Sequence, residues 1–107
     1  MKDLAVIILA AGKGTRMNSD LPKVLHPINN KPMILHVIKS AHEINASPII
    51  TIVGYKHELI EQTLKDEKVE FALQREQNGT GHAVMQCENN LKNFYGNVLV
   101  LSGDVPF

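Results

Sequence analysis

Residues 4–9 form an uninterrupted apolar run with no alternating polar side chains. A strand that is apolar on both faces is typical of a parallel sheet covered by helices on both sides. Residues 98–101 have the same character, and residues 49–53 form a third apolar run. Residues 69–73 alternate in part, as a more exposed edge strand does. We therefore expect four strands of one mostly parallel sheet.

Three segments between these runs, residues 34–44, 56–65 and 80–91, have the apolar spacing of amphipathic helices. Pro32 would lie near the first turn of the first helix, and Thr80 is a candidate N-cap of the third. Strands that alternate with helices predict right-handed crossovers and a Rossmann-like α/β fold with three layers, α/β/α. The side chains expected to face inward are Ile34, Val37, Ile38, Ala41 and Ile44, then Leu59, Ile60 and Leu64, then Val84, Cys87 and Leu91.

Length and charge narrow the class of protein. The 107 residues suit one domain, and 11 Lys and Arg balance 11 Asp and Glu, which leaves no field that would attract nucleic acid or an anionic membrane. No apolar run approaches the roughly 20 residues that span a bilayer. The single cysteine, Cys87, excludes an internal disulfide and suits a reducing compartment. We expect no nucleic-acid or membrane partner, a cytoplasmic location, and a core position for Cys87.

Glycines and polar residues cluster after three of the predicted strands. Residues 12–16, Gly-Lys-Gly-Thr-Arg, follow the strand of residues 4–9. Gln74 and then residues 79–82 follow the strand of residues 69–73, and Gly103 and Asp104 follow the strand of residues 98–101. Ligands of such sheets bind beyond the carboxyl ends of the strands, near the point where the strand order reverses. The same clusters are therefore the candidate site.

The first cluster favours phosphate binding. Glycines let backbone N–H groups approach an anion, and Lys13 and Arg16 add two cations. The segment is not a P-loop, because Gly14 follows Lys13, and it is not a full dinucleotide fingerprint, because Met17 stands at the third glycine position. By spacing alone, the glycines fit a tight turn equally well.

Two further charged residues have competing interpretations. Lys23 follows Pro22 and could supply a third cation to the phosphates, although most lysines are solvated surface residues. Asp104 could hold Mg²⁺ together with substrate phosphates, or it could accept hydrogen bonds in the turn before Pro106. The histidines show no metal-ligand spacing, and His82 reads as an ordinary polar residue in the first turn of a helix.

Residues 9–17, Leu-Ala-Ala-Gly-Lys-Gly-Thr-Arg-Met, and 21–26, Leu-Pro-Lys-Val-Leu-His, resemble the nucleotide loop of the sugar-phosphate nucleotidylyltransferases. Within that superfamily the match is to the bacterial N-acetylglucosamine-1-phosphate uridylyltransferases, the N-terminal domain of a bifunctional enzyme. Gln74 and residues 79–83 and 103–106 continue the match, which covers essentially the whole chain. The resemblance implies the N-terminal portion of a nucleotide-diphospho-sugar transferase fold, without the sugar-binding half and the acetyltransferase domain.

The resemblance also implies an activity: transfer of a uridylyl group from UTP to N-acetylglucosamine 1-phosphate, with Mg²⁺, to give UDP-N-acetylglucosamine, a peptidoglycan precursor, and pyrophosphate. Arg16 and Lys23 would be the catalytic residues, and Asp104 the metal ligand. Ser102 departs from the family, which carries an aromatic residue there. The residues implied to bind nucleotide are Leu9, Ala10, Ala11, Gly12, Lys13, Gly14, Gln74, Gly79, Thr80, Ser102 and Gly103.

Two alternatives stay open beside this reading. The chain could be a non-catalytic nucleotide-binding fragment, or it could belong to a nucleotidylyltransferase with another base or sugar phosphate. Residues 98–101 should form a central strand that lacks its outer neighbour, and an exposed apolar edge invites pairing with a second copy. We therefore expect this chain to self-associate, and the longer protein to be a homo-oligomer.

Overall fold

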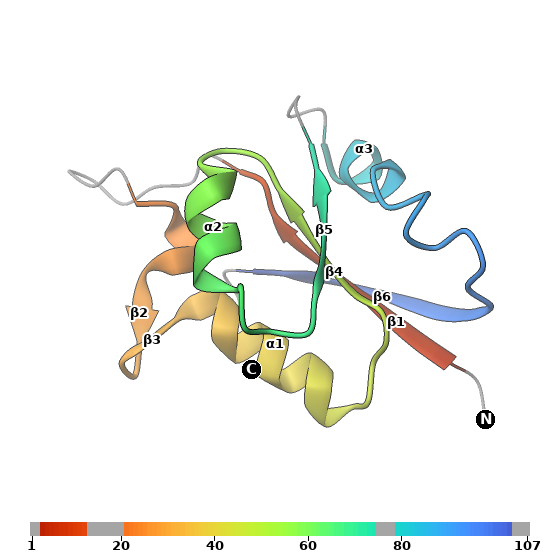
Figure 1. The fold of residues 1–107 in the computed structure, drawn as a ribbon, viewed down its shortest axis with the longest axis horizontal. Coiled ribbons are helices and arrows are strands. Elements are labelled where there is room, and N and C mark those ends of the chain that lie inside the picture. The colour runs from red at the N-terminus through yellow and green to blue at the C-terminus, as the bar shows by residue number, and fades with distance from the viewer. Residues whose placement is uncertain (1–2, 13–20, 75–78, 104–107) are drawn as a thin grey trace.

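The structure, a computed structural model, describes residues 3–12, 21–74 and 79–103 (Figure 1). A sheet of four strands forms its centre, in the order β5-β4-β1-β6. All three neighbouring pairs are parallel. The predicted mostly parallel sheet is therefore confirmed. The strands are β1 (Asp3–Ala10), β4 (Ile49–Val53), β5 (Glu70–Leu73) and β6 (Gly96–Ser102).

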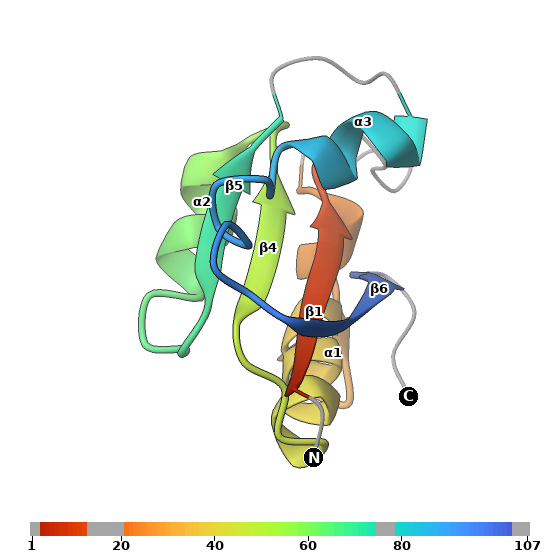
Figure 2. The same ribbon diagram turned by 90° about the vertical axis from the view of Figure 1, so that its right-hand side faces the viewer.

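Helices cover both faces of this sheet, as the apolar runs of β1 and β4 require. α1 (Met33–Glu43) and α2 (His57–Thr63) pack on one face, where Val6, Ile8 and Val53 are buried against them. α3 (Gly79–Met85) packs on the other face, where Ile7, Ile50 and Ile52 join one core with Cys87. Figure 2 shows α1 behind the sheet and the segment from α3 to β6 in front of it. The three-layer α/β/α prediction is confirmed.

Several predicted helix boundaries were wrong. α1 ends at Glu43, so Ile44 leaves the apolar face and is 48% exposed. Leu59 is 44% exposed on α2, whereas Ile60 and Leu64 are fully buried as expected. α3 begins at Gly79 and ends at Met85. Thr80 therefore lies inside the helix and is not its N-cap, although Cys87 and its neighbours Val84 and Leu91 still pack on the predicted face through the turns that follow.

The long connection after β1 contains structure that the apolar pattern did not indicate. A single turn of 3₁₀ helix, η1 (Lys23–Leu25), precedes a small hairpin of β2 (Pro27–Ile28) and β3 (Lys31–Pro32). The hairpin turns through Asn29 and Asn30, both with positive φ, of 52° and 68°. Asparagine tolerates this left-handed conformation, and two such residues in succession match the twist of a hairpin.

β6 lies at the open edge of the sheet, beside β1. Its apolar sequence predicts burial on both faces, yet Val98, Leu99 and Val100 are 43%, 41% and 38% exposed. Among the described residues, no strand pairs with its outer side. The sequence of β6 is thus that of a central strand, whereas its position here is that of an edge.

Candidate functional site

The strand order reverses between β1 and β6. The chain runs outward from β1 to β4 and β5, then returns to place β6 on the other side of β1. At the carboxyl end of this pair, the amide of Gly103 donates a hydrogen bond of 2.9 Å to the carbonyl oxygen of Leu9. Gly103 is buried, and a Cβ there would lie 3.1 Å from both Leu9 O and Val24 Cγ1. The reversal point predicted to bind a ligand is therefore closely packed, with η1 beside it.

A second close approach joins the ends of β1, β4 and β5. The amide of Tyr55 donates to the carbonyl oxygen of Ala11 at 3.2 Å, and the amide of Gln74 donates to that of Val53 at 2.8 Å. A Cβ at Gly54 would lie 2.8 Å from Gln74 O and 3.0 Å from Ala11 O. Only glycine fits between these carbonyl groups without moving the backbone. The segments after three strands thus meet at one edge.

Gln74 is a buried polar residue at this edge, with only 4% of its surface exposed. Its side-chain nitrogen Nε2 lies 3.1 Å from Nδ1 of His82, in the first turns of α3. An amide nitrogen can only donate, so Nδ1 of His82 accepts this hydrogen bond. The backbone carbonyl of His82 in turn accepts a hydrogen bond of 3.2 Å from Nε2 of Gln86. The amide of Gln74 is therefore held between the sheet and α3.

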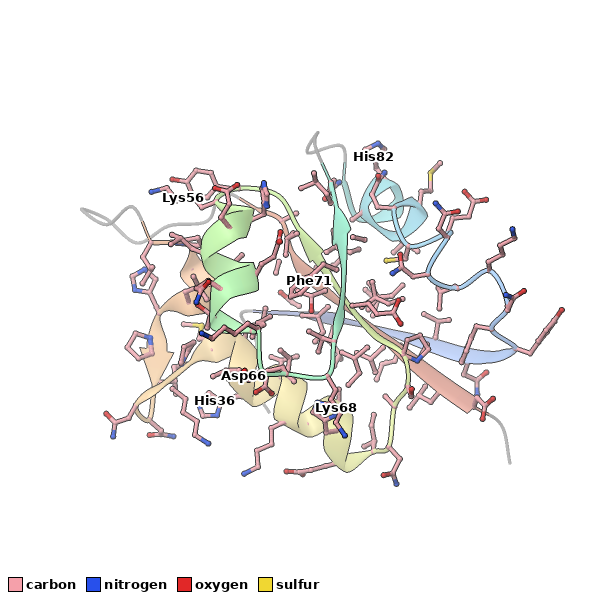
Figure 3. The ribbon with its side chains drawn as sticks, viewed as in Figure 1. His36, Lys56, Asp66, Lys68, Phe71 and His82 are labelled. Carbon is pink, nitrogen blue, oxygen red and sulfur yellow. The ribbon has the colours of Figure 1, made fainter. Side chains whose placement is uncertain are left out.

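Sequence reasoning missed two residues at this edge. The sequence does not indicate the contact of His82, because its partner Gln74 is eight residues away and only the fold brings the two side chains together. Lys56 precedes α2 in a left-handed conformation, with a φ of 50°. Figure 3 shows Lys56 and His82 at the same end of the molecule, opposite Asp66 and Lys68. Lys56 belongs to no motif, whereas His82 lies in the segment 79–83 that carries the family resemblance, where it had no role of its own.

The predicted nucleotide residues within the described ranges gather at the same edge. Ala10 and Ala11 are buried, at 4% and 5% exposure, and Gly12 beyond them is exposed. Lys23 is exposed at the start of η1, and Leu9 and Ser102 are half-buried. Gly79 and Thr80 form the start of α3. Their nearness to one another is a property of the fold, and their nucleotide contacts stay predictions.

Four predicted site residues lie outside the described ranges: Lys13, Gly14, Arg16 and Asp104. Within residues 3–12, 21–74 and 79–103, no group of three or more His, Cys, Asp or Glu side chains is arranged to hold a metal ion. In those same ranges, no helix has the length and apolar character needed to cross a membrane. The predicted magnesium ligand therefore remains a prediction from the sequence.

His36, His57 and Cys87 have structural roles, as predicted. His36 Nε2 lies 2.6 Å from the carbonyl oxygen of Ile28, and the ring nitrogens of His57 lie 2.7 Å from Glu61 and 2.6 Å from Glu58. Cys87 is fully buried in the core under α3. Burial, and next the nearby charge of Glu70, raise the pKa of its thiol to about 11. Cys87 is thus an inert core residue.

Residues 6–107 match the family of MobA-like NTP transferase domains. The chain belongs to this family. The match extends over nearly the whole sequence and includes every segment that meets at the carboxyl edge. The resemblance to nucleotidylyltransferases inferred from the motifs is therefore confirmed.

Close relatives carry one name. "Bifunctional protein GlmU" of Streptococcus uberis is 55% identical over 100 residues, which are 94% of this chain and 22% of that protein. The protein of the same name from Gloeothece citriformis is 51% identical over 104 residues, 96% of this chain and 23% of its own length. The chain thus spans less than a quarter of the length of these relatives.

Solved structures share the fold. A CTP:phosphocholine cytidylyltransferase from Streptococcus pneumoniae superposes with a TM-score of 0.79 at 28% identity, over 95% of this chain and 45% of that one. HddC from Yersinia pseudotuberculosis, complexed with GMP-PN, superposes with a TM-score of 0.75 at 30% identity, over 97% and 48% of the two chains. The fold class implied by the sequence, that of a nucleotide-diphospho-sugar transferase, is confirmed.

Proposed function

We propose that this chain is the N-terminal, nucleotide-binding part of an enzyme that transfers a uridylyl group from UTP to N-acetylglucosamine 1-phosphate. The observation that carries the proposal is that the segments after β1, β4 and β5 meet at the carboxyl edge of the parallel sheet, where the side chain of Gln74 is buried. Relatives that are 51–55% identical and named as one bifunctional protein support the same reading.

The reaction needs positioning and charge neutralisation more than covalent chemistry from the protein. A phosphate oxygen of the sugar phosphate attacks the α-phosphorus of UTP and forms the new P–O bond. The bond from the α-phosphorus to the bridging oxygen breaks in line, and pyrophosphate leaves with the electron pair. Cations that meet the growing charge on the leaving phosphates lower the barrier. We assign this task to Arg16 and Lys23, assisted by Lys13.

The geometry around the described part of the edge supports these assignments. Lys23 begins η1, and the next residue, Val24, lies against Gly103 at the end of β6. Gly103 is immediately followed in the sequence by Asp104. A carboxylate is the ligand type that Mg²⁺ takes together with substrate phosphates, and the ion would neutralise phosphate charge when bound. We therefore propose Asp104 as its protein ligand.

Two substitutions test these roles in a protein that extends this chain at its carboxyl end. Arg16→Ala and Asp104→Asn should each lower kcat/KM at least ~100-fold, the scale of losing one charge-stabilising contact in the transition state. Lys39→Ala, an exposed lysine on α1, serves as the control and should leave turnover unchanged. Near-normal turnover of either site variant would contradict the assigned role.

A second candidate is that the 107-residue chain binds nucleotide without turning it over. The observation favouring it is that relatives with this fold are more than four times as long, at 22–23% coverage. Pyrophosphate release by this chain, compared with release by an extended one, separates the two. Turnover by the 107-residue chain would contradict the second candidate. A different base or sugar phosphate would appear as a changed substrate preference in the same assay.

We also propose a partner and a location. The outer edge of β6 carries no charge and no proline over seven residues, so it lacks the features that keep edge strands apart. A second copy of this chain is its proposed partner, paired antiparallel along β6. The compartment proposed is the cytoplasm, where a single unpaired thiol such as Cys87 stays reduced.

A further inference from the structure

The hydrogen bond between the side chains of Gln74 and His82 orients the amide group of Gln74. A carboxamide has a donor arm and an acceptor arm that are nearly the same shape, and a free amide can turn over to present either. In Gln74 the nitrogen is 3.1 Å from Nδ1 of His82, which accepts one of its two N–H groups. The carbonyl oxygen Oε1 must then occupy the other arm. While Nδ1 of His82 carries no proton, the side chain of Gln74 presents its donor and acceptor in this one order.

That order distinguishes one pyrimidine from another. Uracil presents N3–H beside the carbonyl O4, a donor followed by an acceptor. Cytosine presents unprotonated N3 beside an amino group, an acceptor followed by a donor. An amide that can turn over pairs with both bases. An amide held in one order pairs with one of them and opposes the other with like groups.

We infer that His82 is a specificity-determining positioning residue, which selects uracil over cytosine by holding the amide of Gln74 in one orientation. The inference rests on the proposed function, because it takes Gln74 to face the base. The setting supports it: Gln74 is 4% exposed, and its backbone N–H donates to Val53 O at 2.8 Å, which fixes the main chain from which the side chain projects.

The test measures dissociation constants of the 107-residue chain for UTP and for CTP. The reference chain should prefer UTP. His82→Leu removes the acceptor and should reduce the CTP-to-UTP ratio of dissociation constants about tenfold, the value of one well-ordered hydrogen-bond pair. His82→Asp keeps an acceptor at the same position, so any charge repulsion weakens both nucleotides and the ratio is retained. Gln86→Leu removes the other hydrogen bond to His82 and should leave the ratio unchanged.

A nucleotide-free measurement keeps the inference testable if a variant fails to fold. Ring ¹⁵N shifts of His82 at neutral pH should show Nδ1 without a proton and Nε2 carrying one, because Nδ1 accepts from Gln74. A proton on Nδ1 would overturn the inference, as would an unchanged ratio in a folded His82→Leu chain that still binds nucleotide. If neither the folded reference chain nor a chain extended at its carboxyl end bound any nucleotide, the proposed function would be overturned, and the specificity role with it.

Discussion

The amide of Gly103 and the carbonyl oxygen of Leu9 are joined by a hydrogen bond of 2.9 Å across the ends of β6 and β1. It extends the parallel pairing of β1 with β6, whose register ends at Leu9 and Ser102. The strand order reverses at this pair, and open α/β sheets bind their ligands at the carboxyl ends of the strands beside such a reversal. The proposed nucleotide site is built on this pair.

The packing around Gly103 predicts that the position accepts no larger side chain. Gly103→Ala places a Cβ 3.1 Å from both Leu9 O and Val24 Cγ1, so it should lower the free energy of unfolding by about 1–3 kcal/mol. Urea unfolding, followed by circular dichroism, measures this free energy of unfolding. Gly81→Ala is the matched control: nothing lies within 4 Å of a Cβ there, and alanine in a helix should stabilise the chain by about 0.5–1 kcal/mol. The opposite ranking of these variants would contradict the packing described here.

Thr51 predicts a gain in stability. Its hydroxyl is fully buried in β4 with no hydrogen-bond partner among the described residues. Thr51→Val keeps the shape of the side chain and removes the unsatisfied oxygen, so the free energy of unfolding should rise by about 1–3 kcal/mol. Thr63→Val, at an exposed hydroxyl that donates to Leu59 O at 2.8 Å, should change stability by less than about 0.5 kcal/mol. A loss of stability in Thr51→Val would show that the hydroxyl has a partner.

The thiol of Cys87 predicts a pH dependence. Its pKa rises from 9.0 to about 11 in the fold, chiefly through burial and then through Glu70. The folded chain therefore holds this proton to higher pH than the unfolded chain does. The raised pKa therefore contributes to the free energy of unfolding below pH 9, and this contribution is lost as the pH rises toward 11. Midpoints of urea unfolding from pH 8 upward should fall more steeply for the reference chain than for Cys87→Ala. Equal slopes would contradict the shift.

The open edge of β6 predicts self-association. Val98, Leu99 and Val100 are each about two-fifths exposed on a strand with no outer neighbour among the described residues. Sedimentation velocity should show a fraction of dimer that rises with protein concentration. Val100→Lys should shift the equilibrium toward the monomer. Leu59→Lys, at 44% exposure on α2, is the control and should leave association unchanged. A monomer at every concentration would rule out the proposed partner.

The layers were predictable because they follow from periodicity. The apolar runs of β1 and β4 could only be satisfied between two layers of helix, and both strands are buried. Boundaries were less predictable. Ile44 and Leu59 continue an apolar pattern, but the helices end or turn before these side chains reach the core. The predicted burial of β6 was wrong for another reason. An apolar strand of this kind is buried only when a neighbour covers its outer side, and the described residues supply none.

The segments that meet at the carboxyl edge were predictable from the sequence, whereas their contacts were not. Glycines after strands pointed to the carboxyl edge, where Gly54 and Gly103 indeed fit between backbone groups. The role of Gln74 came from resemblance alone. His82 lies in one of the clusters singled out in the sequence, but its contact was not predictable, because a hydrogen bond between residues eight apart on different elements depends on how α3 packs against the sheet. Pairings of this kind follow from tertiary packing, which local pattern does not encode.

The most direct test of the proposed site is equilibrium binding of UTP, CTP, ATP and GTP to the 107-residue chain, with and without Mg²⁺, alongside circular dichroism to confirm that the chain is folded. The account predicts selective binding of UTP that Mg²⁺ strengthens and that Gln74→Ala weakens. Equal binding of all four nucleotides, or no binding by a folded chain, would contradict it.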